Sequence, residues 1–97
     1  MTKKEIRNQI NKAVYMYAES LGYQMSDDND GSYVTFSKSN FKSYDDTIDY
    51  HRSYQEANVM SSACAESKAD AYKINEYVKA VKASIEYENA IMEGDVE

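Results

Sequence analysis

Residues 23–38 have the sequence YQMSDDNDGSYVTFSK, and their hydrophobic period differs from that of the segments on either side. The second half of this segment is rich in β-branched and aromatic residues, which is typical of a strand. The Asp, Asn and Gly residues in the middle favour a turn. We therefore predict a β-hairpin with a long acidic loop, in which Val34 and Phe36 face the core. Tyr33 and Thr35 then face the opposite side of the hairpin.

A helix is predicted before this hairpin. Thr2 and Glu5 form a capping-box pattern, which satisfies backbone N–H groups of a first helical turn. Apolar residues then recur every three or four positions, and Gly22 supplies the left-handed residue that ends many helices. We expect a helix over residues 3–21, with an apolar stripe made of Ile6, Ile10, Ala13, Val14, Tyr17 and Leu21.

A second helix is predicted from about Ser62 to Met92, because two apolar stripes run side by side at helical spacing. So wide an apolar face indicates the main core helix, and Gly94 is expected to end it. The first stripe consists of Ala71, Ile74, Val78, Val81, Ile85 and Met92, and the second of Tyr77, Ala80, Ser84, Tyr87 and Ile91.

Residues 43–58 fit two periods. Ser43 and Asp46 can cap a helix, and Ile48 and His51 then share one helical face, yet apolar and polar residues also alternate from Ile48 onward as in a strand. We favour a helix and keep a third strand as the alternative. The expected fold class is α+β and mainly helical, with an N-terminal helix, a short antiparallel β-hairpin and a long C-terminal helix. One compact domain is expected over residues 1–97.

The charge of the chain is strongly negative and unevenly distributed. The 97 residues include 17 acidic and 11 basic side chains, a formal net charge of −6. Residues 1–26 carry four cations against two carboxylates, so residues 27–97 carry −8. This charge opposes direct binding to nucleic acid or to an anionic membrane. The N-terminus lacks the apolar core of a signal peptide and Cys64 is the only cysteine, so we expect a reducing, cytoplasmic location.

The residue patterns do not favour catalysis or a bound cofactor. The segment Asp27–Gly31 resembles a calcium loop, but the first and twelfth positions hold Ser26 and Ser37 where the loop needs carboxylates. His51 is the only histidine that could activate Cys64, and no glycine-rich phosphate loop occurs. A hydrolase built on paired carboxylates needs a cleft, for which a domain of this size has little interior. We expect no enzyme activity, no metal and no cofactor.

Acidic residues and tyrosines are interleaved in the middle of the chain. A helix over residues 43–58 would place Asp45 and Asp49 one turn apart, about 5–6 Å from each other, in a spacing that imitates successive charges of a nucleic-acid backbone. Tyrosine is a residue type that anchors protein interfaces, although acidic residues also serve solubility alone. The candidate partner-binding residues are Asp27, Asp28, Asp30, Asp45, Asp46, Asp49, Tyr50 and Tyr54.

In size, acidity and tyrosine content the chain resembles the small anti-CRISPR proteins of phages and mobile elements that mimic DNA. The resemblance implies an inhibitor, in a bacterial host cell, of a type I RNA-guided surveillance complex. Carboxylates at the six candidate aspartate positions would stand in for phosphates in a groove lined by lysine and arginine. The basic first helix departs from an ideal mimic and would face away from the partner.

An antitoxin or adaptor-type module that neutralises another basic protein is the alternative interpretation. The first interpretation predicts a basic nucleic-acid-binding protein or a surveillance complex as partner, and the alternative predicts another basic protein. Both predict no direct contact to nucleic acid or membrane. The expected assembly is a monomer or a small homo-oligomer.

Overall fold

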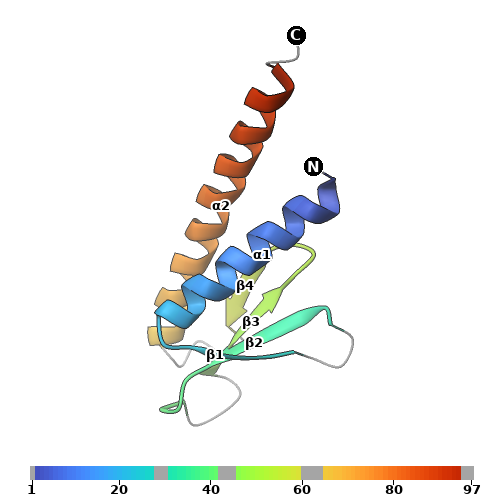
Figure 1. The fold of residues 1–97 in the computed structure, drawn as a ribbon. Helices are drawn as coiled ribbons and strands as arrows, with labels where there is room; N and C mark the ends of the chain where they lie inside the picture. Colours follow the sequence, from blue (N-terminus) through green and yellow to red (C-terminus); the bar gives the residue numbers. More distant parts are fainter. Residues whose placement is uncertain (1, 28–30, 42–45, 60–64, 95–97) are drawn as a thin grey trace.

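The computed structural model describes residues 2–27, 31–41, 46–59 and 65–94, with side chains described as far as residue 88. Along the chain, one helix precedes four strands and a second helix follows them (Figure 1). The predicted α+β class is therefore confirmed, with more strands than the expected hairpin. The strands form one antiparallel sheet in the order β1-β2-β3-β4. The elements are α1 (Lys3–Ser20), β1 (Gln24–Asp27), β2 (Tyr33–Ser37), β3 (Ile48–His51), β4 (Glu56–Val59) and α2 (Ala65–Gly94).

Helix α1 begins and ends where its sequence predicts. The hydroxyl oxygen of Thr2 accepts a hydrogen bond from the backbone N–H of Glu5 at 3.1 Å, which caps the first turn. Gly22 has a φ of 94°, and the N–H of Tyr23 donates to the carbonyl of Ala18 at 3.1 Å. The left-handed glycine and this bond from beyond the helix form a Schellman motif, which ends α1 and directs the chain into β1.

The predicted helix over residues 43–58 is wrong. Within the part of this segment that the structure describes, Ile48–His51 and Glu56–Val59 are strands β3 and β4. The strand alternative is therefore the better one, extended by a fourth strand. The physical reason is burial: Ile48 and Tyr50 are both fully buried, whereas Asp49 between them and His51 after them are half-buried. Only a period of two places both of these large side chains on one face.

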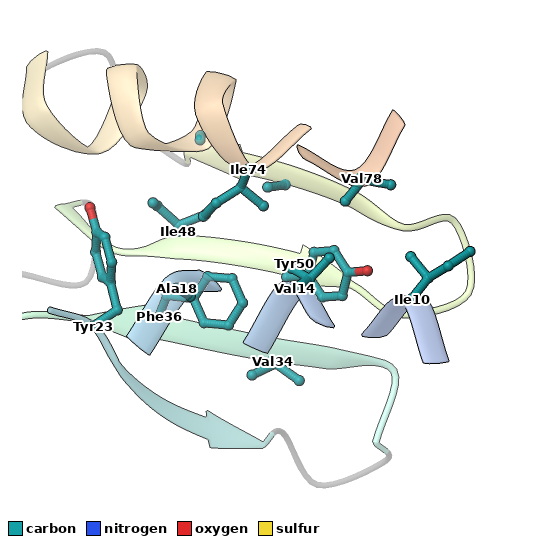
Figure 2. Packing of buried hydrophobic residues seen from close by; sticks show 12 residues of the cluster. Ile10, Val14, Ala18, Tyr23, Val34, Phe36, Ile48, Tyr50, Ile74 and Val78 are labelled. Atoms are coloured by element: carbon teal, nitrogen blue, oxygen red, sulfur yellow. The ribbon is translucent and has the colours of Figure 1, made fainter. Parts of the chain in front are cut away.

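Both helices pack on one face of the sheet. Val34 and Phe36 of β2 point into the core as predicted, where the ring of Phe36 stacks on that of Tyr50 with centroids 5.8 Å apart (Figure 2). Helix α1 contributes Ile10, Val14 and Ala18 to this cluster, and α2 contributes Ala71, Ile74 and Val78. The opposite face of the sheet carries the remaining strand side chains, most of them polar.

Only the first of the two predicted stripes on α2 enters the core. Ile74 and Val78 are buried, and Val81 and Ile85 are half-buried. In the second stripe Tyr77 stacks on Tyr17 of α1 at 4.4 Å, but Ala80, Ser84 and Tyr87 are exposed. The reason is length: a helix of 30 residues spans about 45 Å and extends beyond the short strands (Figure 1).

Candidate binding surface on the sheet

The side chains that point away from the helices define the outer sheet face. Their placement follows from the register, in which Thr35 lies between Ser26 and Asp49, and His51 lies between Tyr33 and Glu56. Because alternate residues of a strand point to opposite faces, these rows lie opposite Val34, Phe36 and Tyr50. The outer sheet face consists of Gln24, Ser26, Tyr33, Thr35, Ser37, Asp49, His51, Glu56 and Asn58.

The strands carry negative charge only. They contain the carboxylates Asp27, Asp49 and Glu56, and no lysine or arginine. The two cations described next to them are engaged by carboxylates of the chain itself. Arg52 pairs with Asp27, and Lys38 lies 2.7 Å from Glu66 of α2 and 3.6 Å from Asp70. The hydrogen bond to Glu66 raises the pKa of Lys38, so this cation stays charged in its pair. Among the described residues, the outer sheet face includes the carboxylates Asp49 and Glu56 and no lysine or arginine.

An aromatic row runs across one end of the outer sheet face. The ring of His51 lies 4.5 Å from that of Tyr33 in an edge-on arrangement and 4.5 Å from that of Tyr54 in the β3–β4 loop. Tyr33 is 42% exposed and Tyr54 is 77% exposed. Large exposed rings held by a neighbouring ring lose little conformational entropy on binding, which suits them to anchor a partner.

The predicted site residues fall into three groups. Asp49 lies on the outer sheet face, where it accepts a hydrogen bond from the hydroxyl of Thr35 at 3.2 Å. Asp46 is half-buried just before β3, and Asp27 sits on the helix side of the sheet in its pair with Arg52. The expected helix would have placed Asp45, Asp46 and Asp49 close together on its surface. Asp46 and Asp49 do not share a helix, because Asp49 belongs to strand β3. Asp28, Asp30 and Asp45 lie outside the described residues.

Tyr50 is a core residue, which corrects its prediction as a contact residue. Its side chain is 0% exposed, and its hydroxyl donates to Oδ1 of Asn11 at 2.7 Å. Burial, and secondarily the nearby Tyr15, raises the pKa of Tyr50 well above its ordinary value. Tyr54, by contrast, is on the surface as expected.

Tyr33 and Thr35 lie on the side of the hairpin opposite the core, as predicted, but His51 and Glu56 were not predicted to lie on the same face. The signal was present in the alternation of residues 48–51, which places Asp49 and His51 on the side opposite Ile48 and Tyr50. In a helix, by contrast, Asp49 and His51 would point in different directions and would not share one face. The assignment of the surface therefore depended on the assignment of the strand.

Within residues 2–27, 31–41, 46–59 and 65–94, no three His, Cys, Asp or Glu side chains gather closely enough to hold a metal ion. Gly31, described at the end of the predicted acidic loop, has a φ of 77°, as a turn requires. The expectation about Cys64 concerns a residue outside the described ranges. Neither helix, over its described length, combines the length and apolar character needed to cross a membrane.

Comparison with known proteins gave no match: no family model fits the sequence, and no curated protein or solved structure is similar to the chain.

Proposed function

We propose that this chain is a non-enzymatic binding protein that presents its outer sheet face to a basic surface of a protein partner. The observation that carries the proposal is the composition of that face, which combines Asp49 and Glu56 with the exposed ring of Tyr33 and the half-buried ring of His51, and whose described residues include no lysine or arginine. Carboxylates steer a basic partner toward the face, and aromatic contacts then hold it.

In its most specific form, the partner is a groove that normally receives DNA, and the chain is a DNA mimic of the anti-CRISPR type. Asp49 and Glu56 lie on neighbouring strands in diagonal positions, a spacing of about 7–8 Å that suits successive phosphate contacts. The aspartates of the sheet loops, whose structure is not described, add to the same charge in the sequence. Occupation of the groove would block the binding of target DNA.

The alternative is an antitoxin or adaptor-type module that neutralises a different basic protein. The aromatic row favours it, because a tyrosine and a histidine in mutual contact recognise protein side chains and do not reproduce a phosphate backbone. Under this alternative the same face binds its partner, but DNA does not compete for the site.

The test is displacement of labelled target DNA from a purified type I surveillance complex. We expect the protein to displace DNA, and to do so roughly tenfold less effectively as salt rises from about 50 to about 200 mM, because charge steers the encounter. Reversal of the face in Asp49→Lys with Glu56→Lys should abolish displacement. The milder pair Asp49→Asn with Glu56→Gln should weaken it with the sheet left intact.

The matched control is Glu19→Lys with Glu88→Lys, which makes the same change of charge at exposed positions on the two helices. If the control loses as much displacement as the sheet variant, net charge and not the outer sheet face carries the activity. If the protein binds the complex but DNA stays bound, the mimicry fails and the adaptor alternative stands.

A further inference from the structure

We propose that the chain has a second binding site, a basic groove that takes an acidic peptide segment. The two helices diverge toward the N-terminal end of α1 (Figure 1). The groove is lined by the N-terminal half of α1, the β3–β4 loop and α2. Its volume is about 550 Å³, within the range of about 300–1,000 Å³ that ligand pockets occupy. This inference goes beyond the proposed function, since it concerns another surface with the opposite charge.

The charge of the groove is inverted relative to the whole chain. Lys3 and Arg7 of α1 line it together with Lys82 of α2, whereas Glu86 is the only carboxylate among its described lining residues. A protein of net charge −6 thus gathers three cations around one hollow. Such a cluster costs repulsive energy in the free protein, and a bound anion relieves that repulsion.

The groove also offers apolar contacts between its cations. Ile6 and Ile10 line it from α1, and the exposed ring of Tyr54 lines it from the loop. Tyr54 and Gln55 also line an adjoining hollow of about 350 Å³ along α2, which includes Glu56 and Lys79, and Lys79 lies 3.2 Å from Glu76. A ligand that fits must carry both carboxylates and at least one apolar side chain, and a peptide provides this combination.

The loop that forms one wall is held in place before any ligand binds. Gln55 has a φ of 54°, and its N–H donates to the carbonyl of His51 at 2.7 Å. Its side-chain amide donates to the backbone carbonyl of Arg7 at 3.2 Å, which ties the loop to α1. A wall fixed by such bonds reduces the entropy lost on binding.

A short acidic peptide fits this site better than a nucleic acid does. A nucleic acid carries negative charge on every phosphate along its strand, beyond the part that could lie in the groove. The negative charge of the rest of the protein would repel those phosphates. A short peptide places only a few carboxylates at Lys3, Arg7 and Lys82. Ile6 and Ile10 in the groove favour the aliphatic side chains of a peptide over nucleic-acid bases, since bases prefer to stack on aromatic rings.

The experiment is a fluorescence-anisotropy titration with a labelled peptide in which two leucines are flanked by glutamates. We expect saturable binding that Arg7→Gln with Lys82→Gln weakens roughly tenfold. The control Lys12→Gln with Lys68→Gln changes the charge equally on the same two helices at exposed positions outside the groove, and should retain affinity within about twofold. The outer-face variant Asp49→Asn, whose residue lines neither hollow, should also retain it, which separates this site from the proposed function.

Equal loss in the groove variant and in its control would overturn the proposal, because binding would then depend on net charge. Binding of the matched peptide with glutamines in place of the glutamates at equal strength would also overturn it. A labelled oligothymidylate that binds the groove more tightly than the acidic peptide would make nucleic acid the occupant and refute the peptide assignment.

Discussion

The hydroxyl of Tyr50 is the polar atom at the centre of an otherwise apolar cluster. It donates to Oδ1 of Asn11, which is itself buried on the sheet side of α1 and also lies 3.4 Å from the amide nitrogen of Gln55. A buried hydroxyl without a partner costs about 1–3 kcal/mol, so Asn11 is needed wherever Tyr50 fills the core. This pair therefore fixes the position of α1 over β3.

The first prediction concerns Tyr50→Phe. At pH 7 the variant should unfold with a free energy about 0.5–1.5 kcal/mol lower than the parent protein, because the bond to Asn11 is lost. Burial raises the pKa of Tyr50 in the folded state above the unfolded value of about 10. The stability that the neutral phenol contributes is complete below this pH and is lost as the pH rises above it. Phenylalanine does not ionise, so the gap between the two proteins should narrow above about pH 10.

Urea unfolding of both proteins at pH 7 and at about pH 10.5 measures this gap. The other tyrosines are common to the two chains, so their ionisation cancels in the difference. A gap that stays constant or widens would show that the phenol of Tyr50 ionises as readily in the folded protein as in the unfolded one.

The side chain of Asn75 on α2 hydrogen-bonds to the backbone of strand β4, as a neighbouring strand would. Asn75 accepts a hydrogen bond from the N–H of Ala57 at 2.8 Å and donates to its carbonyl at 2.9 Å. Both backbone groups lie on the edge of the sheet, where unpaired groups otherwise invite pairing with another chain. The side-chain amide of Asn75 thus provides hydrogen-bond partners for both backbone groups of Ala57 and holds α2 against the β4 edge.

The second prediction is that Asn75→Ala lowers the free energy of unfolding by about 1–3 kcal/mol, because two backbone groups lose their partner. The amide of Ala57 should also exchange its hydrogen faster. Asn58→Ala, in the same strand but on the outer sheet face, should change stability by less than about 0.5 kcal/mol. Equal effects of the two variants would mean that the bonds from Asn75 do not support the edge.

Local sequence patterns were sufficient to predict those helices and strands for which capping residues, glycines and hydrophobic period all indicate the same structure. The capping pair Thr2 and Glu5, the glycine after α1 and the alternation of Val34 and Phe36 each have one interpretation, and the structure matches them. Residues 46–59 carry both periods, so the choice depends on contacts far away in the sequence. Ile48 pairs with Phe36 and Tyr50 with Val34, and these cross-strand pairs complete the core only in the strand form.

The binding surface could be predicted only as far as the strand assignment was right. Asp49 and Tyr54 lie on the surface under either period, whereas Tyr50 changes from an exposed to a buried residue when a strand replaces a helix. The basic character of the first helix was visible in the sequence, but the groove was not. Lys82 follows Lys3 and Arg7 by 75 residues or more, and the three cations line one groove through the packing of α1 against α2.

At the level of the whole molecule, the net charge conceals two surfaces of opposite sign. Ion pairs within the chain, such as Lys38 with Glu66 and Arg52 with Asp27, neutralise the cations next to the sheet. Among the described residues, the outer sheet face contributes the carboxylates Asp49 and Glu56, and the groove at the start of α1 contributes the cations Lys3 and Arg7. One molecule presenting both surfaces is suited to contact two different partners, or two regions of one partner.

The most direct test of the outer sheet face as a binding surface is an NMR titration of the ¹⁵N-labelled protein with a short arginine-rich peptide at about 150 mM salt, where weak surface attraction is screened. We expect the largest shifts at the amides of Tyr33, Asp49, His51 and Glu56, and we expect Asp49→Lys with Glu56→Lys to remove them. Shifts concentrated instead on the carboxylates of α2, or unchanged in the reversed variant, would contradict it.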